Sequence, residues 1–161
     1  MKVSAIVVTR GDVDLAECLP KIKADEMVTP RGRRGVWARW EAAAHVKHDV
    51  IYVQDDDAVV DFRGVVEAYD PSAVVCNMPM GHRPNYPDGI ALVGWGTVFH
   101  RSMLSAFDRY KERFPMDKLF RREADRVFTG LNPCKLIEVP FRHLPVAFGS
   151  DRMSTQRCET G

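Results

Sequence analysis

The 161-residue sequence predicts an α/β fold, with a mixed, mostly parallel β-sheet between helices in a single domain. Short runs of β-branched residues alternate with segments whose apolar residues recur at helical spacing. This alternation is typical of a sheet that helices cover on both faces. The length is that of one domain, and a hydrophobic content of 45% is enough to form its core.

The first half of the chain is expected to form three strands and two helices. Continuous β-branched residues predict strands at 3–8 and 50–54, and a short apolar pair predicts another at 27–28. A helix is expected over 12–22, where aspartates can cap its start and a proline bends or ends it. A second helix is expected over 34–47, because its apolar residues lie on one helical face, where Trp37 and Trp40 are expected to fill the core.

The second half is expected to add strands and helices around a proline-rich loop at 78–88. The last strand precedes an irregular tail. The expected elements are a helix at 61–69, a strand at 73–77, a strand with a glycine break over 90–99, helices at 102–113 and 117–129, and a strand at 136–141.

Charge, cysteines and hydropathy exclude several classes of protein. The net charge is +1, so bulk attraction to nucleic acid or to a membrane is not expected to dominate, and a nucleic-acid partner is disfavoured. The four cysteines are widely spaced without a C-x-x-C pair, which disfavours zinc and favours a reducing compartment. No signal-peptide pattern and no apolar run of about 20 residues is present, so we expect a cytoplasmic protein without a membrane span.

Three consecutive aspartates, Asp55, Asp56 and Asp57, follow the buried run at 50–54. If the strand continued, pleating would place Asp55 and Asp57 on one face, roughly 7 Å apart. Two such charges repel by roughly 2 kcal/mol at an effective dielectric of about 20. A divalent cation would offset this repulsion, because hard cations bind carboxylate oxygens. The alternative is a solvated turn rich in aspartate.

Five segments follow one another along the chain: Val8-Thr9-Arg10, residues 35–43, Asp55-Asp56-Asp57, residues 94–101 and Glu123-Ala124-Asp125. Their order resembles the GT-A glycosyltransferases, which carry a DxD metal motif, with Asp56 as its middle residue here. The resemblance implies a GT-A-like, Rossmann-like fold and a hexosyltransferase-type enzyme. Such an enzyme moves a sugar from a nucleoside-diphosphate sugar, a UDP-sugar first, to a hydroxyl acceptor.

Two other functions remain open at this stage. One is a sugar-phosphate nucleotidyltransferase, although Thr9-Arg10-Gly11-Asp12 matches poorly the glycine-rich loop that such enzymes place after the first strand. The other is a non-catalytic module that binds nucleotide or sugar with the same fold. Such a module would need no acceptor-side acid.

By resemblance, the aspartates and a late histidine hold Mn²⁺ or Mg²⁺. Asp57 would bind the metal directly, and Asp55 would contact the ribose or a metal-bound water. Asp56 would face the opposite side and meet the sugar or a helix terminus. His143 would be a further ligand that favours Mn²⁺, or else a surface histidine.

Arginines are the candidate ligands of the donor phosphates, because guanidinium groups bind phosphate bidentately. Arg34 and Arg39 come first, near a helix amino terminus that attracts anions. Thr9 and Arg10 have a similar place at the end of the first strand. Arg152 lies on the tail, which by resemblance closes over the donor. The alternatives are a solvated basic face and a disordered terminus.

Acidic and aromatic residues are the candidates on the acceptor side. Asp125 is the first candidate for the base that activates the acceptor hydroxyl, and Glu123 the second. Residues i and i+2 do not share a helix face, so only one should enter the site. The alternative is a charged helix face that pairs these acids with neighbouring arginines. Trp95 would stack on a sugar or fill the core, and Gly94 and Gly96 would permit close backbone approach.

The resemblance also suggests how the domain is divided. Residues 1–77 would form the nucleotide-binding half, 78–145 the acceptor-side half, and 146–161 a mobile tail. The acceptor side is small, so we expect a macromolecular acceptor that docks on an open site, or a second subunit in a homo-oligomer that completes it.

Overall fold

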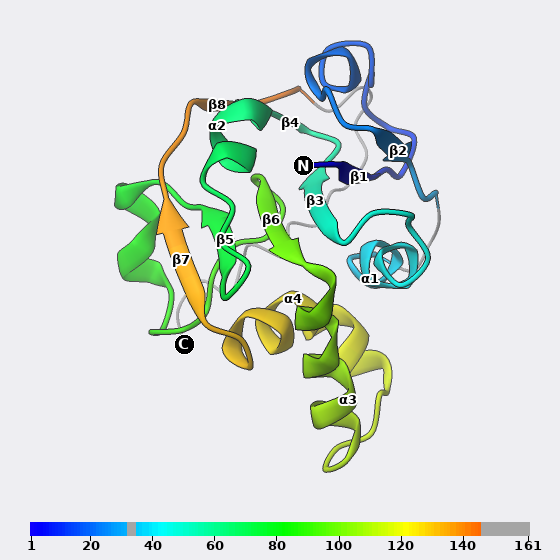
Figure 1. Ribbon diagram of the computed structural model, residues 1–161, viewed down its shortest axis with the longest axis vertical. Coiled ribbons are helices and arrows are strands. Elements are labelled where there is room, and N and C mark those ends of the chain that lie inside the picture. The colour runs from blue at the N-terminus through cyan, green and yellow to red at the C-terminus, as the bar shows by residue number, and fades with distance from the viewer. Residues whose placement is uncertain (32–34, 146–161) are drawn as a thin grey trace.

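A six-stranded sheet crosses the computed structural model, which describes residues 1–31 and 35–145 (Figure 1). The strand order is β2-β1-β3-β6-β5-β7. Among the described strands of this sheet, only β6 is antiparallel to its neighbours, so the sheet is mostly parallel, as predicted. The strands are β1 (Val3–Val8), β2 (Glu26–Val28), β3 (Val50–Asp55), β5 (Val74–Asn77), β6 (Thr97–His100) and β7 (Cys134–Ile137).

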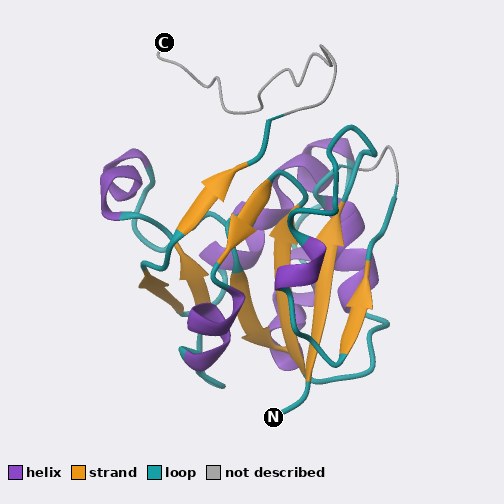
Figure 2. Cartoon of the chain, turned by 90° about the horizontal axis from the view of Figure 1, so that it is seen from above, coloured by secondary structure: helices purple, strands orange, loops and turns teal. Residues whose placement is uncertain are grey.

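Helices lie on both faces of this sheet (Figure 2). One face packs against α1 (Trp37–Ala43), α3 (Ser105–Lys111) and α4 (Lys118–Gly130), and the other against α2 (Phe62–Glu67). No described helix has the length and apolar character that a membrane crossing requires. Three short 3₁₀ helices complete the described part: η1 (Leu19–Lys21), η2 (Met80–Asn85) and η3 (Arg101–Leu104).

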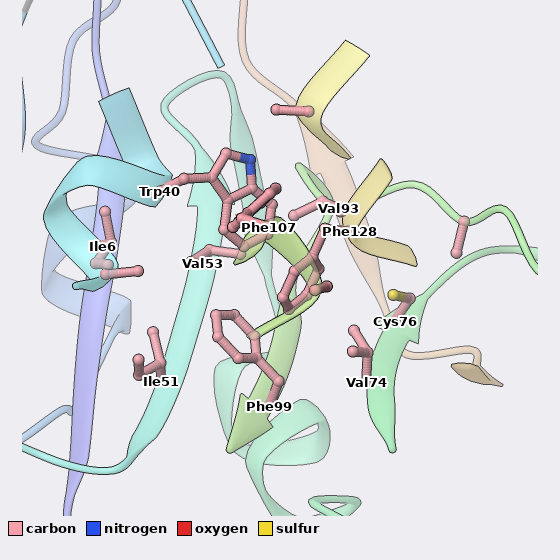
Figure 3. Packing of buried hydrophobic residues seen from close by; sticks show 14 of the residues in the cluster. Ile6, Trp40, Ile51, Val53, Val74, Cys76, Val93, Phe99, Phe107 and Phe128 are labelled. Carbon is pink, nitrogen blue, oxygen red and sulfur yellow. The ribbon is translucent and has the colours of Figure 1, made fainter. Parts of the chain in front are cut away.

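Two apolar clusters form the core, one on each face of the sheet. Successive strand residues point to opposite faces, so Ile51 and Val53 join one cluster while Tyr52 joins the other. Figure 3 shows the first cluster, where Trp40 and Phe128 pack with ring centroids 4.2 Å apart. The strands therefore read as continuous apolar runs because both of their faces are covered.

A second, two-stranded sheet joins the last described residues to the turn at Asp56 and Asp57, which we call the aspartate turn. It pairs β4 (Ala58–Val60) with β8 (Phe141–His143), and Ala58 lies opposite His143. The sequence did not predict β4, and the predicted strand at 136–141 is instead divided between β7 and β8. Pro140 lies between these two strands, and a proline has no N–H to donate to a ladder.

The predicted helix over 12–22 is wrong, because the structure has only η1 there. Asp14 accepts a hydrogen bond from the Ala16 backbone N–H at 2.9 Å, a local turn that competes with a helix. Pro20 lies in the first turn of η1. The predicted strand before the glycine break at 90–96 is also absent from the described elements, and pairing begins at Thr97.

Candidate functional site

The candidate residues gather where the carboxyl ends of β1 and β3 meet. These strands are parallel, and Val8 lies opposite Asp55. The Arg10 backbone N–H donates to Asp56 Oδ2 at 3.4 Å, and the Asp55 N–H donates to the Gly94 carbonyl at 2.8 Å. This edge of an open α/β sheet is where such folds commonly bind ligands.

A buried arginine joins two of the predicted acids. Arg39, from α1, donates through Nη2 to Asp55 Oδ1 at 2.5 Å, and its Nε lies 3.8 Å from Asp125 Oδ1. Trp40 donates from Nε1 to the same Asp125 oxygen at 2.9 Å. We call these four residues, Arg39, Trp40, Asp55 and Asp125, the arginine cluster. It connects the end of β3 with α1 and α4, so residues far apart in the sequence meet at one point.

Arg39 is buried, whereas the sequence suggested a ligand of the donor phosphates or, as the alternative, part of a solvated basic face. Its side chain is only 2% exposed, and its Nε and Nη1 have no hydrogen-bond partner among the described residues. Burial opposes the charge, but the carboxylates of Asp125 and Asp55 hold the pKa of Arg39 above its usual value. Native proteins leave few buried donors unpaired, so this arginine marks an unusual polar point in the core.

Asp125 is the acid of α4 that faces the cluster. Burial raises the pKa of its carboxyl above the usual value, although Arg39 opposes this shift. Glu123 instead forms ion pairs with Arg122 at 3.1 Å and Arg126 at 3.4 Å on the outer side of the helix. The prediction that only one of the two acids enters the site is consistent with these contacts.

Gly94 and Gly96 allow the loop before β6 to approach β3 closely, as the sequence predicted. A Cβ atom on Gly94 would lie 2.0 Å from Asp55 Oδ2, so the Asp55 carboxylate occupies the space of a side chain. Gly96 has a φ of +98°, and a Cβ atom there would lie 2.8 Å from Val60 Cγ1. Only glycine fits both positions without displacement of its neighbours.

The expected pleating of the three aspartates is wrong. β3 ends at Asp55, and Asp56 and Asp57 form the turn into β4, so strand alternation does not extend across them. Asp56 is buried at 4% exposure and accepts from the Arg10 N–H. The carbonyl of Asp57 accepts a hydrogen bond from the Leu144 N–H at 2.6 Å. Aspartates favour turns, and this preference ended the strand.

The predicted metal ligands have suitable chemistry but do not converge on one point. Asp55 is 39% exposed and is already paired with Arg39, Asp57 lies in the turn, and His143 is exposed on β8 beside it. Within residues 1–31 and 35–145, no group of three or more His, Cys, Asp or Glu side chains is placed to hold a metal ion. Carboxylate oxygens nevertheless suit Mg²⁺ and Mn²⁺.

Trp95 lies in an aromatic group beside the turn. It is 5% exposed and stacks on Phe141, with ring centroids 4.7 Å apart. His82 and His143 contact it edge-on at 4.8 and 5.1 Å. These contacts match the core-filling alternative for Trp95, because Phe141 already occupies one face of the indole.

The remaining candidates lie apart from the cluster or outside the described residues. Thr9 is buried at the end of β1, where its Oγ1 accepts from the Gly11 N–H at 2.9 Å, and Arg10 beside it is exposed. Arg34 and Arg152 are outside the described residues. A surface cavity of about 410 Å³ lies at η1, β4 and α2 and contains none of the predicted site residues.

The sequence missed two members of the site. Trp40 was expected only to fill the core, but its indole N–H also holds Asp125. Gly94 was expected to allow close approach, but not against Asp55 itself. The signal for Trp40 was its position next to Arg39 on the same helix, and nothing in the sequence indicated its partner 85 residues away.

No protein-family model matches the sequence, and no curated protein is recognisably similar to it. Solved structures do match in three dimensions. The 4-diphosphocytidyl-2C-methyl-D-erythritol synthase of Anaerococcus prevotii has a TM-score of 0.54 and 12% identity over 86% of this chain and 89% of its own. A197 from STIV has a TM-score of 0.51 and 19% identity over 90% and 86%.

A third match is glucosyl-3-phosphoglycerate synthase of Mycobacterium tuberculosis, in complex with Mg²⁺ and UDP. It has a TM-score of 0.49 and 10% identity over 89% of this chain and 72% of its own. Identities this low show the fold alone. The chain therefore has a mixed α/β, single-domain fold with a mostly parallel sheet, and it shares this fold with the Anaerococcus prevotii synthase and with A197.

Proposed function

We propose that this chain is a metal-dependent glycosyltransferase that moves a sugar from a nucleoside-diphosphate sugar to a hydroxyl acceptor. The observation that carries the proposal is the arginine cluster. It brings Asp55, from the predicted donor side, within reach of Asp125, from the predicted acceptor side, through one buried guanidinium. A structural helix face would have placed Asp125 in solvent with the arginines of α4.

Asp125 acts as the base in this proposal. The acceptor oxygen forms a bond to the anomeric carbon, the bond from that carbon to the diphosphate oxygen breaks, and the hydroxyl proton passes to Asp125. A raised pKa suits this role, because a base works best when its pKa is near the working pH. Trp40 orients the carboxylate through its 2.9 Å hydrogen bond.

Arg39 is a positioning residue rather than a phosphate ligand. Its guanidinium contacts both Asp55 and Asp125 and is itself shielded from solvent. The donor phosphates are then left to Arg10 and to Arg34 and Arg152, which lie outside the described residues. In this proposal Asp57, Asp55 and His143 would have to draw together to hold Mn²⁺ or Mg²⁺, because they do not converge in the described structure. The ion would neutralise the charge of the leaving diphosphate.

The test measures the melting temperature with each nucleoside diphosphate, with and without Mn²⁺, and then donor hydrolysis and transfer. We expect metal-dependent stabilisation by one nucleotide, lost in Asp57→Ala. Asp125→Asn should bind the donor normally but lose transfer, whereas the exposed Asp108→Asn on α3 should keep both activities. Absence of metal-dependent stabilisation by any nucleotide would refute the proposal.

The same protein preparation separates the two alternatives. A sugar-phosphate nucleotidyltransferase would instead release pyrophosphate from a nucleoside triphosphate and a sugar phosphate. A non-catalytic binding module would show nucleotide binding that Asp125→Asn leaves unchanged, without turnover in either assay. Full transfer by Asp125→Asn would exclude Asp125 as the base.

A further inference from the structure

An exposed surface of mixed basic and apolar character lies at the turn of the α3–α4 hairpin, whose first helix, α3, extends away from the sheet (Figure 1). Phe114 is 55% exposed and Leu119 is 58% exposed. Three exposed cations lie beside them in the sequence: Lys111, Arg113 and Lys118. We call these five residues the hairpin tip.

The hairpin concentrates positive charge that the whole chain lacks. Residues 109–122 contain six Lys or Arg and two acids, whereas the complete chain has a net charge of only +1. One of these acids, Asp117, caps α4 by accepting from the Phe120 N–H at 2.9 Å. Lys111, Arg113 and Lys118 form no ion pair within the described part of the chain. The hairpin tip is therefore a local cationic surface.

The two apolar side chains of the tip are not part of the core. Phe120, on the same hairpin, is 2% exposed and packs into the core, whereas Leu119 beside it faces outward. Phe114 contacts Tyr110, with ring centroids 5.1 Å apart, so its ring is supported on one side and open on the other. Exposed aromatic and leucine side chains among lysines and arginines are typical of surfaces that enter a membrane interface.

We propose that the hairpin tip binds an anionic membrane surface. Phe114 and Leu119 would enter the headgroup region, and Lys111, Arg113 and Lys118 would lie beside the lipid phosphates. A nucleic acid would match the cations but would offer no apolar environment to Leu119. The proposal rests on the exposed residues alone and does not depend on the proposed transfer reaction.

The position of the tip on α4 gives the proposal a geometric consequence. Asp125 follows Leu119 on this helix after six residues, which is about 9 Å of helix rise. A chain docked through the tip would therefore hold the arginine cluster close to the membrane. Molecules presented at that surface would be within short reach of Asp125.

The test is flotation of the full chain with vesicles of phosphatidylcholine alone or with a third of phosphatidylserine. We expect binding to the anionic vesicles only, weakened by high salt. Lys111→Glu, Arg113→Glu and Lys118→Glu together should lower the affinity about a hundredfold or more, since each cation near an anionic surface adds about fivefold. Phe114→Ala with Leu119→Ala should lower it about tenfold or more.

The matched control reverses three exposed lysines outside the hairpin, Lys2→Glu, Lys21→Glu and Lys23→Glu, and should keep binding within severalfold of the unmodified chain. All variants should keep the unmodified melting temperature, because the changed side chains are exposed. No flotation of the unmodified chain, or equal loss in the control, would overturn the proposal. So would tighter binding to an oligonucleotide that the reversal at the tip abolishes.

Discussion

Arg39 and Asp125 define the site at the scale of single residues. The sequence identified both as candidates, because an arginine at the start of a helix and an acid on a later helix fit the pattern of the motifs. It could not show that the two meet, since that contact depends on how α1 and α4 pack on the sheet. It assigned Arg39 to the donor phosphates, with a solvated basic face as the alternative, and it gave no sign that the side chain is buried, because arginine is usually exposed.

The pKa of Asp125 predicts an unusual pH dependence of stability. Its folded pKa lies above the ordinary value of 3.8, mainly because of burial, so the folded state disfavours ionisation. Below the pKa of Asp125 in the unfolded chain, the carboxyl is protonated in both states and does not affect the free energy of unfolding. As the pH rises from there through the folded pKa, the free energy of unfolding falls. We therefore expect the stability of Asp125→Asn, relative to that of the unmodified chain, to rise progressively as the pH rises from about 3.

The measurement is urea denaturation of the unmodified chain and of Asp125→Asn at a series of pH values from about 3 upward. Asp70→Asn is a control of opposite sign, because hydrogen bonds from Ser72 lower the pKa of Asp70. The unmodified chain should gain stability over this control variant as the pH rises. A stability difference for Asp125→Asn that does not change with pH would contradict the assignment.

The elements that form the site were predicted unevenly. β1, β3, α2, β5 and α4 were expected near their observed positions, because apolar periodicity dominates buried segments. The helix at 12–22 was not formed, and β4 was missed. Both errors lie in short segments, where local turns and pairing with distant strands outweigh intrinsic propensity.

Gly94 supplies a prediction at the scale of elements, since it determines how closely the loop before β6 approaches β3. In Gly94→Ala, the new methyl group would overlap the Asp55 carboxylate, whose Oδ2 is 2.0 Å from the Cβ position. We expect a loss of about 1–3 kcal/mol in the free energy of unfolding, the usual cost of an overfilled site. Any nucleotide-dependent stabilisation should weaken as well.

Gly81→Ala is the matched control, because no atom lies within 4 Å of its Cβ position. Its urea midpoint should stay close to that of the unmodified chain. If Gly94→Ala were as stable as Gly81→Ala, the Asp55 carboxylate would have to move easily. The close packing of loop and strand would then have no role in holding the site.

The whole molecule combines a well-covered central sheet with a small second sheet at its side. The class of the fold followed from the alternation of strands and helices, and the order of the strands did not. The antiparallel direction of β6 and the pairing of β4 with β8 depend on contacts between segments far apart in the sequence. Periodicity within one segment contains no information about such contacts.

We expect the two sheets to differ in local stability. β3 is paired on both sides and its residues 50–54 are buried, whereas β8 pairs with β4 through three residues and is half exposed. Amide hydrogen exchange in the native state should therefore be slowest in β3 and substantially faster in β8. The readout is exchange followed by NMR or mass spectrometry. Equal protection in both strands would show that the second sheet opens only with global unfolding.

The hydrogen bond from the Leu144 N–H to the Asp57 carbonyl has a consequence for synthesis on the ribosome. The aspartate turn emerges early, whereas β8 and Leu144, which hold its far side, are among the last described residues to be made. The nascent chain can build β1 and β3 long before that turn acquires its final neighbours. The candidate site is therefore completed only after Leu144 has emerged, and a chain terminated before 141–144 would lack this support for the turn.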